Sequence, residues 1–369
     1  MGSSDRDEVV AKVTSGAAWR EFCRELEAAG EAVLKEGNPA DPLDRAEGYR
    51  MLTRLLRGAL ESQLEYHDPL HPELVCTCHE TIKIVAENPD NLYLGAGIEG
   101  RHDYRVWGTR GGARWLSFNT FAGGGFGGGG RGTGTTLHER ELAVRPDGGF
   151  EVILSQRPAP GNWLRLEPDT RLLTIRQTFF DKGRDPRAEL HIERLGEPAP
   201  RAPLDPAHLY RALLGSARHV RAITEIGAAW SRRQSAHPNV FANVQQDDTF
   251  KFKDPQITWN QAWFELGPEE ALQVDLDPPR CDYWMIALHN FWTETLDYRY
   301  HPVARNSGNA KLEADGSARF VIAHRDPGHP NWLDTAGHAH GIVGVRWVGE
   351  GVENRVPRAR RVRFAELAG

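Results

Sequence analysis

The stretch HRDPGHPNWLDTAGHAHG, residues 324–341, carries four histidines and two aspartates. Asp334 and His338 are four residues apart across a glycine-containing turn, which is close enough for their side chains to pair. A carboxylate bonded to an imidazole fixes the tautomer of the histidine and makes the ring a better base. We therefore expect Asp334 and His338, with Asp326 beside them, to perform general acid/base catalysis.

Other polar residues of this region are candidates for substrate binding. Arg325 and Arg346 carry guanidinium groups that suit a substrate oxyanion. The remaining candidates are His289, Asn290, Glu294 and His340. A simpler alternative is a local turn, in which Asp334 accepts a hydrogen bond from the backbone of Ala336 or Gly337.

A transition-metal site is a further alternative. His338 and His340 occupy alternate positions of an expected strand, so both would face one side, about 6 to 7 Å apart. Together with His324, Asp326 or Glu294 they could bind a metal ion. The ligand set is incomplete, however, because no glutamate follows at the spacing of a cupin metal motif. We expect no bound metal and no cofactor.

The segment AGGGFGGGGRGTGTT, from Ala122 to Thr136, also stands out. It has no Gly-Lys-Ser/Thr end and precedes no helix, so neither a phosphate-binding loop nor a dinucleotide fingerprint is present. One hypothesis is a mobile flap over a cleft, with Arg131 contacting an anion. The simpler hypothesis is a flexible surface loop, and the sequence leaves the role of the segment open.

The elements that must position these residues belong to an internal duplication. An Asn-Trp-Leu motif begins at Asn162 and again at Asn331, and an Asp-Gly pair recurs at nearly the same offset. Arg176 and Arg346 are matched in the same way. Features shared by both copies predict scaffold: the tryptophan between layers, and the arginines at a sheet edge. Polar residues found only in the second copy, above all His338, predict function.

Short apolar runs of 5 to 9 residues, bounded by Asp-Gly, Pro-Gly or Gly-Gly turns, predict antiparallel sandwiches. An amphipathic helical pattern precedes each set of strands. We predict an α+β protein with two tandem units, each a helix plus an antiparallel β-sandwich of jelly-roll type. The boundaries are an N-terminal helical extension at 1–45, a first unit at 46–200 and a second unit at 201–369.

Three further segments carry local predictions. The helix of the extension should stop at Gly30 and bury a stripe consisting of Trp19, Phe22, Leu26 and Ala29. The segment RAPLDP, residues 201–206, should link the two units. The arginine-rich segment RVPRARRVRF, residues 355–364, should form an edge strand with a solvated basic face.

The bulk composition restricts the classes of function. The net charge is −6, which argues against a nucleic-acid partner. A polar N-terminal sequence and the lack of 18 uninterrupted apolar residues argue against membrane insertion. Four isolated or closely spaced cysteines fit a reducing compartment. We expect a cytoplasmic protein whose partner is a small molecule; a homo-oligomer is left open by the sequence.

The C-terminal half resembles a bacterial family catalogued as domain of unknown function 1214. The resemblance covers about residues 255–348 and rests on spaced motifs that occur in the same order, the last of which are DPG, NWLDT, GH and RW. The matching residues are Asp326, Pro327, Gly328, Asn331, Trp332, Leu333, Asp334, Gly337, His338 and Arg346. It implies a β-sandwich, jelly-roll-like fold but no activity. It also implies that His329 and His340 depart from the family pattern, which favours Asp334 with His338 over a metal site.

These observations predict an enzyme that acts on a small organic molecule by acid/base chemistry, a hydrolase or a lyase. The first alternative is a non-catalytic binding protein for an aromatic, sterol-like or sugar ligand; the second is a metal-dependent enzyme using His338 and His340. An enzyme requires His338 in a cleft, whereas a binding protein requires an apolar pocket. If His338 faces a cleft, His338→Ala should cost less than about 1 kcal/mol of stability. Trp332→Ala should cost about 3–5 kcal/mol.

Overall fold

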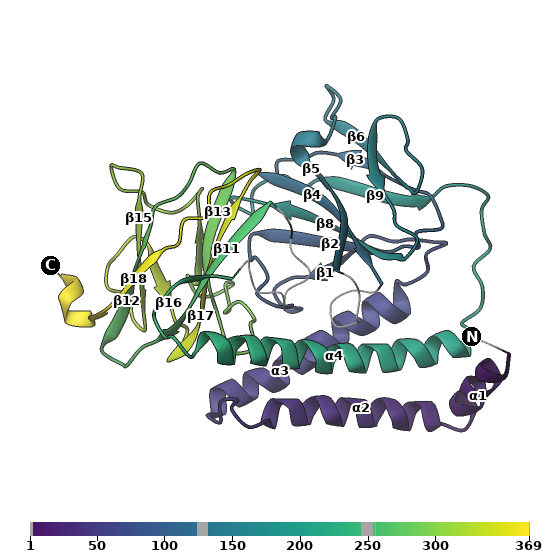
Figure 1. Ribbon diagram of the computed structural model, residues 1–369, viewed down its shortest axis with the longest axis horizontal. Helices are drawn as coiled ribbons and strands as arrows, with labels where there is room; N and C mark the ends of the chain where they lie inside the picture. Colours follow the sequence, from purple (N-terminus) through teal and green to yellow (C-terminus); the bar gives the residue numbers. More distant parts are fainter. Residues whose placement is uncertain (1–2, 124–131, 245–253, 255, 369) are drawn as a thin grey trace.

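The computed structural model describes residues 3–123, 132–244, 254 and 256–368. Two β-sandwiches lie side by side, and a layer of helices runs along both of them (Figure 1). The helices are α1 (Ser3–Thr14), α2 (Ala17–Leu34), α3 (Pro42–Leu60) and α4 (Pro206–Gln234). Searched over the described residues, none of them is long and apolar enough to span a membrane.

The helices that open the two units begin in the same way. Asp41 and Asp205 are the N-caps of α3 and α4, and each carboxylate accepts a backbone N–H of the first turn. A proline follows each cap, where its missing N–H is not needed. Local sequence therefore fixes where α3 and α4 start, one before each set of strands.

The helix predicted in the N-terminal extension differs from its prediction in two respects. Helix α2 continues past Gly30 to Leu34, because a glycine inside a helix costs only about 1 kcal/mol and the helix packs against α4 on both sides of it. Phe22 and Ala29 are buried as predicted, but Trp19 is 61% exposed. Trp19 lies in the first turn, where its ring contacts that of Phe22 at a tilt of 50° and stays largely in solvent.

The first sandwich pairs a five-stranded sheet, in the order β1-β2-β8-β4-β5, with a four-stranded sheet, β7-β6-β3-β9. Only the β6–β7 pair is parallel among the pairs of this sandwich in the described residues. The strands are β1 (Val75–Cys78), β2 (Asn91–Gly97), β3 (Tyr104–Thr109), β4 (Trp115–Ala122), β5 (Gly132–His138), β6 (Gly149–Ser155), β7 (Asn162–Arg165), β8 (Thr170–Thr178) and β9 (Glu189–Arg194).

The second sandwich repeats this topology strand by strand, in the orders β10-β11-β17-β13-β14 and β16-β15-β12-β18. The parallel pair recurs as β15–β16. The predicted duplication is therefore confirmed. The strands are β10 (Ala242–Asn243), β11 (Ile257–Glu265), β12 (Glu270–Leu276), β13 (Tyr283–His289), β14 (Ala304–Asn306), β15 (Ala318–Ala323), β16 (Trp332–Asp334), β17 (His340–Val348) and β18 (Arg358–Arg363).

The shared Asn-Trp-Leu motif fastens the parallel strand in each copy. The amide of Asn162 accepts the Ala143 N–H and donates to the carbonyls of Ala143 and Glu151. Asn331 makes the corresponding three bonds, to Lys311 and to the carbonyl of Arg319. The motif is thus scaffold, as predicted.

The predicted position of the motif's tryptophan, between the two sheets, was wrong. Trp332 is only partly buried and packs on the outer face of its sheet, next to Val362 and Phe364. Leu333 fills the space between the sheets and is fully buried. Residues alternate faces along a strand, so a core position for the leucine places the tryptophan outside.

The edge-strand prediction for the C-terminus is correct, since β18 ends the sheet β16-β15-β12-β18 and buries Val362.

The helical layer is shared between the units. The part of α3 up to Arg54 contacts the second unit, where the side chains of Arg54 and Glu294 are 2.9 Å apart. The last turns of α3, from Leu55 onward, face the first sandwich.

Candidate functional site

The predicted Asp334–His338 pair is not formed. The Nε2 atom of His338 lies 2.8 Å from Glu47 Oε2 on α3, and Nδ1 lies 2.9 Å from the carbonyl oxygen of Thr335. His338 is 6% exposed and precedes β17, so it faces no cleft. Asp334 instead bonds His301 at 2.8 Å and accepts the Ala336 N–H. The turn weighed as the simpler alternative is therefore the one present.

Two other predicted residues lie on the surface, away from His338. Asp326 accepts the backbone N–H of Gly328 in a tight turn. Arg325 pairs with Glu269 and lies over the ring of Phe364. Both side chains are accounted for by local structure.

His289, Asn290 and Glu294 belong to a buried polar cluster beneath α3. Asn290 donates to Glu47 Oε2 at 2.7 Å, the oxygen that also bonds His338. Burial raises the pKa of Glu294 to about 7 despite its pairing with Arg54. Burial, reinforced by the charge of Arg346, lowers the pKa of His289 to about 3, so this imidazole is neutral. The cluster joins α3 to the second sandwich.

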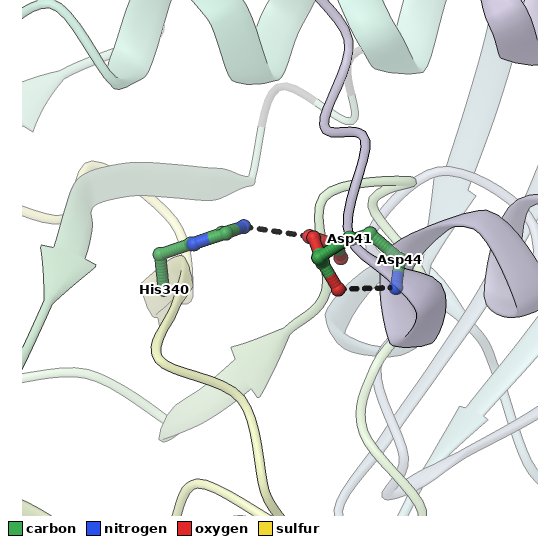
Figure 2. A group of neighbouring side chains, drawn as sticks. All are labelled: Asp41, Asp44 and His340. Carbon is green, nitrogen blue, oxygen red and sulfur yellow. Dashed lines mark hydrogen bonds and ion pairs between the residues drawn. The ribbon is translucent and has the colours of Figure 1, made fainter. Parts of the chain in front are cut away.

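Among the described residues, one group offers three potential metal ligands within 4.8 Å of one another: Asp41, Asp44 and His340. Figure 2 shows the His340 ring directed at the two carboxylates. Its Nε2 lies 2.8 Å from Asp44 Oδ2, and the ring stacks on Trp263. Two carboxylates and an imidazole are ligand types that a divalent cation accepts. As they stand, they form a helix cap and an ion pair, which the positive end of α3 stabilises.

His338 and His340 therefore do not converge on one point, because they bond two different carboxylates of α3. The hydrogen bond to Asp44, which outweighs burial, raises the pKa of His340. Burial is the main cause of the raised pKa of Asp44.

A cavity of about 610 Å³ lies elsewhere, between the five-stranded sheet of the first unit, the helices and the near end of the second unit. Its wall is mainly apolar and aromatic. The aromatic residues that line it are Tyr66, Tyr93, Trp115, Phe121, Trp230 and Trp259. Cavities of roughly 300–1,000 Å³ with such walls are typical of small-molecule sites.

The two duplicated arginines, Arg176 and Arg346, both line this cavity. They lie on β8 and β17, the central strands of the two five-stranded sheets, so their predicted position at a sheet edge was wrong. Their neighbours are also matched. Tyr93 pairs with Arg176 across the sheet, as Trp259 pairs with Arg346. The duplication thus places an arginine and an aromatic side chain from each unit in the wall of one cavity.

Strained backbone supports the wall of the cavity next to Arg346. Val85 and Ala86 have φ values of 37° and 51°, a left-handed conformation that a β-branched residue rarely adopts. The carbonyl of Ala86 accepts a hydrogen bond from Arg346, and its N–H donates to Thr293 O at 2.6 Å. Such strain persists only where the surroundings impose it, and it is concentrated at functional sites.

Sequence reasoning named Arg346 as a site residue but missed the rest of the cavity. The signal was the pair of matched arginines, which were interpreted as scaffold because both copies contain them. In the glycine-rich segment 122–136, residues 132–136 belong to β5, and the cavity wall includes Phe121 just before the segment. Arg131, proposed to contact an anion, lies outside the described residues.

The fold and the cavity define a class: a tandem β-sandwich protein with a shared helical layer over a mainly apolar cavity. The family model described as protein of unknown function (DUF1214) matches residues 265–346. A crystal structure of a putative uncharacterized protein from Burkholderia cenocepacia is 41% identical. The match covers 97% of this chain and 99% of that one, with a TM-score of 0.92. The chain therefore belongs to the same family as this Burkholderia cenocepacia protein.

A more distant solved structure shares the fold. The VPA0106 protein from Vibrio parahaemolyticus is 11% identical, with a TM-score of 0.50. The match covers 92% of this chain and 100% of that one. No curated protein matches the chain.

Proposed function

We propose that this protein binds a small, largely apolar organic molecule in the cavity between its two units. The observation that carries the proposal is an apolar space of about 610 Å³ whose wall includes several aromatic side chains. Apolar surface removed from water contributes about 25 cal/mol per Å², so such a wall favours an aromatic or alicyclic ligand. This is the binding protein that the sequence offered as an alternative to an enzyme.

The acid/base enzyme predicted from the sequence stays a prediction, and the geometry gives it less support. It needs His338 in a cleft, but both ring nitrogens of His338 are bonded to oxygen atoms of Glu47 and Thr335. Neither His338 nor Asp334 is among the residues of the cavity wall.

The four free cysteines fit the proposed cytoplasmic location.

The exposed residues of the cavity wall mark its mouth. These are Tyr66, His67, Arg171 and Arg218; the first two lie in the loop that follows residues 61–65, and the others lie at the start of β8 and on α4. The buried part of the wall, with Val85, Ala86 and Arg346, forms the inner end. A ligand would enter between α4 and the first sheet and would be enclosed by both units.

Binding of N-phenyl-1-naphthylamine, an uncharged probe whose fluorescence rises in apolar surroundings, tests the proposal. Thr174 lines the cavity from the middle of β8, and the residue paired with it on β2 is Gly95, which has no side chain. A tryptophan at position 174 should therefore fill the space, and Thr174→Trp should lose most of the probe binding.

Leu312→Trp is the matched control, because Leu312 is exposed and lies outside the cavity wall. It should bind the probe like the wild type. Wild-type protein that fails to bind the probe, or a Thr174→Trp variant that folds and binds it unchanged, would contradict the proposed site.

A further inference from the structure

Resting on the proposed function, we propose that the ligand is an organic carboxylate and that Arg346 binds its acid group at the inner end of the cavity. The duplication supplies the comparison that leads to this inference. Arg176 and Arg346 occupy matched positions on the two central strands and line the same space. The two guanidinium groups differ in whether a carboxylate of the protein is paired with them.

Arg176 has a carboxylate partner within the protein. Its Nη1 atom lies 3.4 Å from Asp254 Oδ2, and the Asp254 side chain is 2% exposed. Within the described part of the chain, no carboxylate lies within the 4.0 Å of an ion pair from Arg346. One of two equivalent guanidinium groups is thus paired with an aspartate, and the other lines the cavity with no such partner among the residues that the structure describes.

Two acidic residues that raise the pKa of Arg346 through their charge have partners of their own. The Glu87 carboxylate lies 3.9 Å from Lys83 Nζ and accepts the backbone N–H of Thr295 at 3.2 Å. Asp90 accepts hydrogen bonds from Tyr283 and from an asparagine amide. Both acids influence the pKa of Arg346 through their charge, although burial, the larger effect, lowers it.

The guanidinium of Arg346 keeps hydrogen-bonding capacity for a ligand. Its bonds within the described residues are to the Ala86 carbonyl and, at 3.2 Å, to the Met285 sulfur. Its face lies 4.1 Å from the centre of the Trp259 ring. An arginine carries five N–H donors, and a carboxylate accepts two of them side by side.

Burial makes this free capacity costly in the absence of a ligand. Arg346 is 4% exposed, and the Ala86 carbonyl, the Met285 sulfur and the Trp259 ring replace only part of the hydration that a buried cation loses. A ligand carboxylate would provide at Arg346 what Asp254 provides at Arg176. The aromatic rings of Trp259 and Tyr93 lie beside the two arginines, so the apolar body of the ligand would contact them.

The test compares 2-naphthoate with 2-naphthamide, which has nearly the same shape and no charge, by titration calorimetry at pH 7. Wild-type protein should bind the acid at least about tenfold more tightly than the amide, as expected for hydrogen bonds between charged groups. Arg346→Met should bind the acid no more tightly than the amide, because the charged group that distinguishes the two ligands is gone. Arg176→Met should keep the preference, because the acid group is bound by Arg346.

The wild-type comparison decides the matter even if Arg346→Met does not fold. Wild-type protein that binds the uncharged fluorescent probe but shows no preference for the acid overturns the inference and leaves the proposed function standing. Loss of the preference in Arg176→Met, but not in Arg346→Met, overturns the assignment to Arg346. Failure of the uncharged probe to bind removes the proposed function and this inference together.

Discussion

Replacing His338 by alanine should destabilise the protein strongly, contrary to what the sequence predicts. Both ring nitrogens of His338 face oxygen acceptors, the carboxylate of Glu47 and the carbonyl of Thr335. An imidazole that donates from both nitrogens is a charged imidazolium. The pair is buried, with His338 at 6% and Glu47 at 7% exposure. His338→Ala would leave the Glu47 carboxylate buried without its cationic neighbour on this side.

The magnitude follows from what Glu47 retains. Removing one partner of a buried ion pair typically costs about 3–5 kcal/mol. Glu47 keeps hydrogen bonds from Arg50 and Asn290, each at 2.7 Å, so we expect a smaller cost, about 2–4 kcal/mol. For a chain of this length that corresponds to a fall of roughly 3–6 °C in Tm.

The effect should depend on pH within a defined window. Burial lowers the pKa of His338, but the hydrogen bond and charge of Glu47 outweigh it and raise the pKa above the ordinary 6.5. This contribution is complete below pH 6.5 and is lost as the pH rises through the raised pKa. Burial raises the pKa of Glu47, but His338, together with Asn290 and Arg50, outweighs burial and lowers the pKa below 4.5. That contribution is present above pH 4.5, so the pair stabilises most between pH 4.5 and 6.5.

Urea unfolding of wild type and variant, measured across this pH range, checks the prediction. His324→Ala is the matched control, because His324 bonds the hydroxyl of Thr335 and the carbonyl of Leu266 and pairs with no carboxylate in the described part of the chain. It should cost about 1 kcal/mol, the contribution of ordinary hydrogen bonds. Trp332→Ala should now cost less than about 3 kcal/mol, because the ring is only half-buried. A His338→Ala variant as stable as the wild type at pH 5.5 would refute the reasoning.

Three further predictions concern other parts of the molecule. Purified protein should carry no stoichiometric transition metal, since His340 is paired with Asp44 and Asp41 caps α3; elemental analysis showing one metal per chain, lost in His340→Ala, would contradict this. Gly341→Ala should destabilise the protein by about 1–3 kcal/mol, because the added Cβ would lie 2.3 Å from a carbonyl oxygen of β13. Gly30→Ala has open space around it and should stabilise α2 by up to about 1 kcal/mol, so thermal melts of the two variants should shift in opposite directions. A thiol reagent should modify the exposed Cys23 quickly and Cys78 only on unfolding, because burial raises the pKa of the Cys78 thiol; equal rates in the native protein would be the contrary result.

The architecture was predictable from the sequence because it depends on local and repeated signals. Alternating apolar residues and turn signals mark the strands, and the matched Asn162 and Asn331 mark the duplication. The surroundings of the polar residues were not predictable. The partner of His338 is Glu47, 291 residues earlier, and no sequence spacing indicates that contact.

The rule used to separate scaffold from function also failed for a physical reason. Residues common to both copies were interpreted as scaffold, and that is correct for Asn331. It misplaced Arg176 and Arg346, because two copies of a scaffold can face each other and enclose a space between them. A cavity formed by both units has a wall of repeated residues, so its signal resembles that of a structural repeat.

The way α3 divides its contacts between the sandwiches means that neither half of the chain is a transferable module. A fragment starting at position 201 would contain a complete sandwich, yet His338 and Glu294 in it would lose Glu47 and Arg54. Two buried ionisable groups would then lack their counter-ions, and the cavity would lose a wall. Once α3 had docked on the second copy, gene fission or the exchange of single units would have cost both stability and the binding space. The two duplicated units can therefore be kept or lost only together.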